Sequence, residues 1–315
     1  MAATTKSKPK PRHEGRVTKV VRDAAEVTTN KILEALKADI VPWQQEWTGN
    51  TGLPTSLATG KLYRGVNVFT LWLTGAAAGY ASNLWGTYRQ IQERGGQVRK
   101  GEKSTEIVFW KIIEKKVDGE DKVKKIPLLR LFHVFNIDQA DWAEGARLPA
   151  VPERTQVDPI EAAEALLADY LAGGPSLAYG GDKAYYKPGA DHIQMPARDD
   201  FTSAEAFYST LYHEASHSTG HSKRLSREGI AQGTFGAFGD KVYSQEELVA
   251  EMGAAILCAI AGIEQKATLD NSAAYIAHWV KALSDDHSLI IKAASAAQKA
   301  VDLIVGTTFD NGEES

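Results

Sequence analysis

The chain has 315 residues, of which 43% are hydrophobic and 24% are charged, and its formal net charge is −4. This composition excludes a largely disordered chain, and the absence of any run of about 18 apolar residues argues against a membrane span. The single cysteine excludes an intramolecular disulfide and a cysteine-based zinc site, and the first residues lack the apolar core of a secretory signal. We therefore expect a cytoplasmic protein that makes no membrane contact.

Charge divides the chain into two unlike parts. Residues 1–143 contain 23 Lys and Arg against 15 Asp and Glu, and residues 144–315 contain 13 against 25. Six of the seven tryptophans also lie in the first part. A basic, aromatic part joined to an acidic part predicts two domains with different partners. We expect an α+β protein with a disordered basic tail over 1–15, a first domain over 16–143, a linker over 144–156, a second domain over 157–305 and a short tail over 306–315.

The first part alternates helical and strand patterns. Apolar residues at helical spacing predict a first helix that ends before Pro42, and the charged segment 114–125 is expected to be a hairpin loop between two strands. The predicted elements are helices over 18–39, from about 63 through 73 and over 87–94, with strands over 107–113 and 128–136.

The residue types of this part fit single-stranded nucleic acid. Bases stack on exposed aromatic rings, and Lys and Arg follow the phosphates. The turn from Arg99 to Lys103 is basic and contains a glycine, which allows the backbone to approach a phosphate. Tryptophan is equally typical of a core, and the pattern alone leaves that alternative open. The candidates for DNA contact are Trp43, Trp47, Tyr63, Arg64, Trp85, Tyr88, Arg89, Arg99, Lys100 and Lys103.

The second part is mainly helical in pattern. Thr202 with Glu205 three residues later predicts a capping box at the start of a helix. The other predicted elements are helices over 159–171, 244–262 and 271–303 and short strands over 184–186 and 192–195.

The capped helix carries the sequence His213-Glu214-Ala215-Ser216-His217. Two histidines four residues apart on a helix point from the same face, and zinc binds two imidazoles and a carboxylate with a fourth position open for water. Glu214 is then placed to act as the general base on that water. This pattern predicts a zinc metallopeptidase site.

The carboxylates of the next helix provide the third ligand. Glu247 and Glu251 are four residues apart and share a helix face. We assign Glu247 to zinc and Glu251 to a ligating histidine, which it would orient, although the opposite assignment remains open. Two alternatives remain. In the first, His213 and His217 are ordinary helix-surface residues and Glu246, Glu247 and Glu251 form a solvated face. In the second, the site binds metal without hydrolysing a substrate. His221 is expected beside the site.

The chain also resembles a known family in both parts. Several segments of the first part resemble the N-terminal domain of ArdC-type antirestriction proteins and are similar to a region of TraC-type plasmid primases. These segments are Pro42-Trp43 with Trp47, Tyr63–Asn67, Leu84–Tyr88, Gly95–Lys103 and Val108-Phe109. The zincin-like metallopeptidase domain of that family is similar to Ala184–Tyr186, Ile193–Pro196, Phe201, Tyr212–His221 and Glu246–Glu251.

The resemblance implies a single-stranded-DNA-binding domain fused to a zincin-like metallopeptidase domain that binds one zinc ion. It also implies protection of incoming plasmid or phage DNA against host restriction. The partners expected are single-stranded DNA and an unidentified protein substrate, such as a component of a host restriction system. The alternative is a DNA-binding module whose zinc is structural or vestigial. A nuclease or primase accessory is disfavoured because the sequence lacks the clustered acidic residues of a two-metal site.

Overall fold

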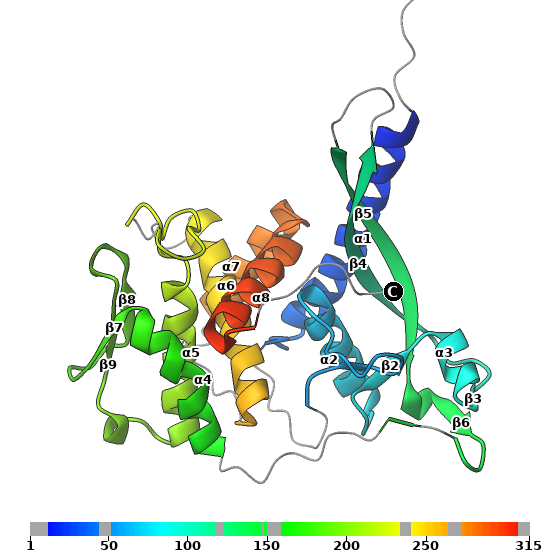
Figure 1. The fold of residues 1–315 in the computed structure, drawn as a ribbon, viewed down its shortest axis with the longest axis horizontal. Helices are drawn as coiled ribbons and strands as arrows, with labels where there is room; N and C mark the ends of the chain where they lie inside the picture. The colour runs from blue at the N-terminus through cyan, green and yellow to red at the C-terminus, as the bar shows by residue number, and fades with distance from the viewer. Residues whose placement is uncertain are drawn as a thin grey trace, which may run out of the picture.

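The structure is a computed structural model, which describes residues 12–43, 52–116, 123–146, 148–149, 159–233, 241–263 and 273–307. It confirms the α+β class (Figure 1). We call residues 12–149 the N-terminal half and residues 159–307 the C-terminal half. The described helices are α1 (Arg12–Lys37), α2 (Val66–Ala78), α3 (Tyr88–Glu93), α4 (Pro159–Gly173), α5 (Ala204–Ser218), α6 (Lys241–Ala261), α7 (Ala273–Asp285) and α8 (Leu289–Val305).

The described strands form sheets in the orders β1-β2-β5-β4, β3-β6 and β7-β9-β8. The first two sheets belong to the N-terminal half and the third belongs to the C-terminal half. In the third sheet β9 pairs in parallel with β7 and antiparallel with β8. The strand bounds are β1 (Thr55–Ser56), β2 (Leu84–Gly86), β3 (Gly96–Val98), β4 (Thr105–Lys116), β5 (Val123–Asn136), β6 (Ala140–Trp142), β7 (Ser176–Tyr179), β8 (Tyr185–Lys187) and β9 (His192–Met195).

The β4–β5 hairpin is longer than the sequence pattern predicts. Its register runs from Thr105 opposite Val134 to Lys116 opposite Val123, so residues 114–116 and 123–125 of the charged segment expected as a loop are strand. A charged sequence is compatible with an antiparallel ribbon because one face of such a ribbon can meet water. The hairpin extends beside α1, away from the C-terminal half (Figure 1).

The helix ends of the N-terminal half follow local chemistry. Helix α1 begins at Arg12, so the tail expected through residue 15 is partly helical, and no proline interrupts the segment after Pro11. Helix α2 continues past the expected end to Gly79, which adopts φ 68° and closes the helix as glycine readily does. The helix expected over 87–94 is confirmed as α3, with Thr87 and Gln90 forming a capping box.

Two expectations for the C-terminal half need correction, and one strand was not expected. The cap of α5 is Ser203, whose extended backbone lets its side chain accept a hydrogen bond from Ala206 N at 3.2 Å, so Thr202 lies one residue too early. The helix expected over 271–303 is divided into α7 and α8, because Asp286 accepts hydrogen bonds from Ser288 and competes with the helical pattern. Strand β7 is formed by a segment for which no element was predicted.

The two halves share one hydrophobic cluster. Trp43 packs edge-on against Trp279 with ring centroids 5.2 Å apart. Across the same boundary Arg64 pairs with Asp302, and Gly65 N donates to the side chain of Gln298 at 3.1 Å. The halves are therefore packed together as well as connected by the chain. Most of the predicted linker, residues 147 and 150–156, lies outside the described residues.

Among the residues that the structure describes, no helix is long and apolar enough to cross a bilayer.

Candidate metal centre

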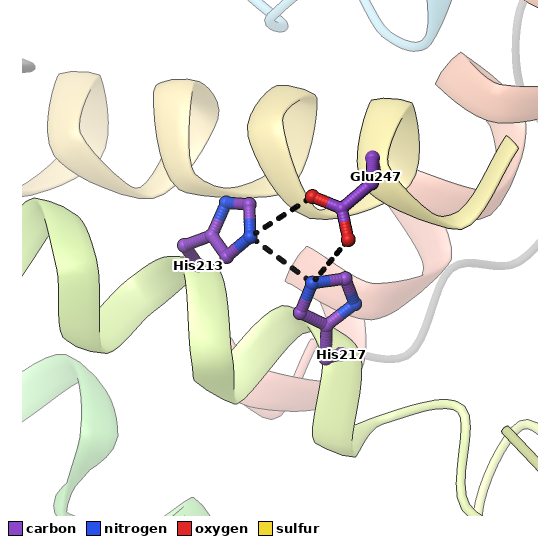
Figure 2. A group of neighbouring side chains, drawn as sticks. All are labelled: His213, His217 and Glu247. Carbon is purple, nitrogen blue, oxygen red and sulfur yellow. Dashed lines mark hydrogen bonds and ion pairs between the residues drawn. The ribbon is translucent and has the colours of Figure 1, made fainter. Parts of the chain in front are cut away.

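Helices α5 and α6 form the candidate site, and a glycine sets how closely they approach. A Cβ added at Gly253 of α6 would lie 2.5 Å from Ser216 Oγ of α5, closer than real Cβ contacts come. Glycine at this crossing therefore lets the two backbones pack closely. The histidine face of α5 meets the carboxylate face of α6 as a result (Figure 2).

The three predicted ligands, His213, His217 and Glu247, converge, and we call them the ligand group. His213 Nε2 and His217 Nε2 are 3.0 Å apart (Figure 2). Glu247 Oε2 lies 3.6 Å from His213 Nε2, and Glu247 Oε1 lies 3.6 Å from His217 Nε2. One potential ligand atom from each residue lies within 4.8 Å of the others, and all three side chains are buried. Two imidazole nitrogens and a carboxylate oxygen form a donor set that suits a divalent transition metal.

Each histidine also has a carboxylate at its second ring nitrogen. Glu251 Oε1 lies 3.3 Å from His213 Nδ1, the kind of position expected for it. Glu246 Oε1 lies 3.1 Å from His217 Nδ1, a contact that the sequence reasoning missed. The signal was present, because a ligating histidine nearly always donates its other N–H and Glu246 precedes the candidate ligand Glu247 in the sequence.

The carboxylates control the charge of the site. Burial alone would lower the pKa of His213, but Glu251, with Glu214 and Glu247, outweighs that effect and raises the pKa to about 9. Burial also raises the pKa of Glu247, against the opposing effect of the two histidines. Burial acts in the same direction on Glu246, but hydrogen bonds from Arg227 and His217 hold its pKa below the usual value. The site is thus a buried group of interacting charges.

Glu214 and His221 occupy different positions relative to this group. Glu214 is 8% exposed, and its negative charge acts on both His213 and Glu247. His221 Nδ1 accepts a hydrogen bond from Lys223 N and lies 3.8 Å from Asp191, and it is not part of the ligand group.

Two of the tryptophans expected to contact DNA are buried. Trp43 is 0% exposed and Trp85 is 2% exposed, so neither offers a ring face on which a base could stack. Both rings contribute to hydrophobic clusters, where burial of a large aromatic surface stabilises the fold. Arg64 pairs with Asp302 across the boundary between the halves, and Tyr63 directs its hydroxyl to Trp85 O at 3.4 Å. Trp47 lies outside the described residues.

The remaining candidates are at the surface around α3 and β3. Tyr88 is 43% exposed and its hydroxyl accepts a hydrogen bond from Gln97 of β3. Lys100 and Lys103 are exposed in the turn that follows β3, and Arg89 is exposed on α3 beside Glu93. Arg99 of the same turn pairs with Glu102 and donates to Asp138 O, so it fastens the turn to the neighbouring chain.

Two family models match the chain. The N-terminal domain of the anti-restriction factor ArdC matches residues 22–135, and a zincin-like metallopeptidase matches residues 161–296. The ligand group lies within the second range.

Similar proteins are found among sequences and solved structures. Uncharacterized protein y4eC of Sinorhizobium fredii is 38% identical over 89% of this chain and 91% of its own length. DNA primase TraC of Escherichia coli is 35% identical over 89% of this chain, which spans only 27% of the primase.

Crystal structures of the antirestriction protein ArdC from plasmid R388 are similar across almost their whole length. The metal-free structure has a TM-score of 0.70 at 40% identity and covers 90% of this chain and 96% of its own. The Mn(II)-bound structure has a TM-score of 0.68 at 40% identity, and the match covers 89% of this chain and 96% of that structure's chain. Because this similarity spans both halves, the chain belongs to the ArdC family of antirestriction proteins.

Proposed function

We propose that this protein is a DNA-binding antirestriction protein whose C-terminal half is a zinc-dependent metallopeptidase. The observation that carries the proposal is the convergence of His213, His217 and Glu247, with Glu214 buried alongside. The donor set favours zinc over manganese, because a site of nitrogen and oxygen ligands generally binds Zn(II) more tightly than Mn(II). The Mn(II)-bound form of the R388 protein supports a divalent metal in this family without deciding which ion this chain takes.

The residues of the site divide the work of peptide hydrolysis. A bound zinc ion would polarise the scissile carbonyl and lower the pKa of a water molecule. Glu214 is the general base that removes a proton from the attacking water and returns it to the leaving amine. His213, His217 and Glu247 hold the ion, and Glu251 and Glu246 hold the second nitrogens of the two histidines.

A second candidate is favoured by the burial of the site. His213, Glu214, His217 and Glu247 are each 8% exposed or less, which leaves little of the group open to a substrate. This observation fits a metal that stabilises the fold of a DNA-binding antirestriction protein without catalysis.

The variant Glu214→Gln distinguishes the two candidates. It keeps the three ligands, so metal content and DNA binding should stay at wild-type levels. We expect cleavage of a denatured protein substrate, measured with and without single-stranded DNA, to disappear. Protection of unmodified DNA entering a restricting host should disappear with it. If the variant protects as well as the wild type does, and the wild type cleaves no protein, the structural-metal candidate replaces the peptidase.

For the DNA partner we propose that the exposed surface around α3 and β3 binds single-stranded DNA. Tyr88 offers a ring for stacking, and Arg89, Lys100 and Lys103 offer positive charge nearby. Phosphate contacts release counterions, so affinity should fall steeply as salt rises.

The test is a charge reversal in the full chain. Lys100→Glu combined with Lys103→Glu should weaken binding to all single-stranded sequences alike and reduce the salt dependence. Lys183→Glu combined with Lys187→Glu is the matched control, since both lysines are exposed in the C-terminal half. Equal losses in the two double variants would place the DNA elsewhere.

A further inference from the structure

Arg227 lies just behind the metal centre and is held from several sides. Its Nε and Nη2 donate to the two carboxylate oxygens of Glu246 at 2.8 and 2.6 Å. Its Nη1 donates to Thr219 Oγ1 at 2.6 Å, and its Nη2 also donates to Ser216 O at 2.8 Å. The guanidinium therefore links the end of α5 to the start of α6 and makes a bidentate contact with one carboxylate.

The same carboxylate contacts a predicted metal ligand. Glu246 Oε1 accepts both from Arg227 and from His217 Nδ1, at 3.1 Å for the ring nitrogen. A proton on Nδ1 leaves Nε2 with its lone pair toward the ligand group, so the carboxylate selects both the tautomer and the ring orientation. The rotamer of Glu246 thus determines where Nε2 of His217 points.

The backbone makes room for this guanidinium. A Cβ added at Gly220 would lie 3.0 Å from Arg227 Nη2 and 3.0 Å from Ile230 Cβ. Arg227 N donates to Gly220 O at 2.9 Å, which fixes the turn that follows α5. The site is built around the arginine, whose side chain is 11% exposed.

Arg224 provides a comparison within the same turn. It is also 11% exposed and pairs with a carboxylate, that of Asp191. Its Nε donates to Ser218 O at 2.9 Å. None of the described partners of Arg224 is a candidate metal ligand or contacts the second nitrogen of one. The two arginines therefore match in burial and in type of interaction and differ in their connection to the metal centre.

We propose that Arg227 is a positioning residue of the metal centre, which holds Glu246 so that His217 presents Nε2 to a divalent ion. The proposal rests on the proposed metal site and does not require peptide hydrolysis. Lysine cannot replace the arginine fully, because its ammonium group is a single point and cannot span both carboxylate oxygens.

The test measures metal affinity of the full chain by competition with a chelator, using Zn(II) and separately Mn(II) as the probes. Loss of an outer hydrogen-bond partner of a ligand typically costs about 10- to 100-fold in affinity. We expect Arg227→Met to lose metal affinity by a factor in this range. Arg227→Lys should lose about tenfold, since lysine cannot donate to both carboxylate oxygens of Glu246 at once. Arg224→Met, the matched control, should stay within roughly twofold of the wild type, because none of its described partners contacts the second nitrogen of a candidate ligand.

A double variant shows whether Arg227 acts through Glu246. If it does, Arg227→Met combined with Glu246→Gln should bind metal no more weakly than Glu246→Gln alone, a departure from additivity that marks coupled residues. Should Arg227→Met fail to fold, Arg227→Lys and Glu246→Gln provide the same comparison. Additive losses, or wild-type affinity in Arg227→Lys, overturn the proposal. A wild type that binds metal while every Arg227 variant binds equally well overturns it too, and leaves the proposed function intact. A wild type that binds no divalent ion overturns both.

Discussion

His217 and His221 lie in the same short segment, yet the structure assigns only one of them to the ligand group. His217 Nε2 is 3.6 Å from Glu247, whereas His221 lies beside Asp191. His217→Ala removes a ligand, so it should weaken zinc binding beyond the roughly 10- to 100-fold that loss of an outer partner costs. His221→Ala should leave zinc binding unchanged. Metal content after mild chelation measures both variants, and equal retention of zinc by the two would contradict the ligand assignment.

The raised pKa of His213 predicts how metal binding depends on pH. Nε2 must lose its proton to bind a metal, and the pKa of the metal-free residue is about 9. Apparent zinc affinity should therefore rise by about tenfold per pH unit and level off near pH 9. Because this pKa exceeds the unfolded value of 6.5, His213 stabilises the metal-free fold below about pH 6.5. That contribution is lost as the pH rises through about 9.

The control for this pH dependence is Glu251→Gln, which removes a charge that raises the pKa of His213. In that variant the affinity should level off at a lower pH. Chelator competition across a pH series measures both curves. A flat wild-type curve between pH 7 and 9 would contradict the prediction.

Single residues were predictable where the chemistry demands a fixed spacing. Two histidines four apart and a carboxylate pair on a later helix indicated the ligand group, and the structure brings those residues together. The role of Glu246 could be inferred only from the need of a histidine for a second partner. Burial of Trp43 and Trp85 could not be predicted, because tryptophan serves both cores and binding surfaces and the sequence does not show which neighbours cover it.

At the scale of elements, the crossing of α5 and α6 determines whether the site forms. Gly253→Ala would place a methyl group 2.5 Å from Ser216 Oγ and 3.1 Å from Ser216 Cβ, so the serine side chain or the helices must shift. Overpacking of this kind costs about 1–3 kcal/mol of unfolding free energy, and zinc affinity should fall with it. Gly173→Ala is the matched control, because this helical glycine has open space and alanine is favoured in helices by up to about 1 kcal/mol.

Denaturant unfolding and metal competition of the two glycine variants test this prediction. Gly253→Ala should be less stable and should bind zinc more weakly, while Gly173→Ala should match or exceed the wild-type stability. Wild-type stability in Gly253→Ala would show that the helix crossing tolerates a side chain.

Elements with strong periodicity were predictable, and their ends less so. Helices α4 and α6 lie close to the predicted ranges because long apolar patterns define them. At the division between α7 and α8, Asp286 accepts hydrogen bonds from Ser288 that a continuous helix would not need. Strand β7 pairs in parallel with β9, so its pattern carried no hairpin signal.

At the scale of the whole molecule, the two halves are expected to unfold together. The sequence predicted two parts from their opposite charge, but it could not show that Trp43 would pack against Trp279 across the boundary. Trp43→Ala should lower the free energy of unfolding by about 3–5 kcal/mol. Its effect should appear equally in circular dichroism and in zinc release on heating. Tyr185→Ala, at an exposed position, should cost no more than roughly 0.5 kcal/mol.

Two separate transitions, with zinc release unaffected by Trp43→Ala, would contradict this coupling. They would instead describe two domains joined only by the segment between them. The result decides whether DNA bound at the surface that we propose in the N-terminal half can influence the metal centre through packed side chains or only through proximity.

The most direct test of the account is anomalous diffraction at the zinc edge from a crystal of the full chain grown with zinc. We predict one zinc peak per chain, bonded to Nε2 of His213, Nε2 of His217 and a carboxylate oxygen of Glu247 at about 2.0–2.2 Å. Glu251 and Glu246 should remain at the Nδ1 atoms of the two histidines. A zinc ion bonded to Glu251 with Glu247 turned away, or no peak at this site in an otherwise intact fold, would contradict the account.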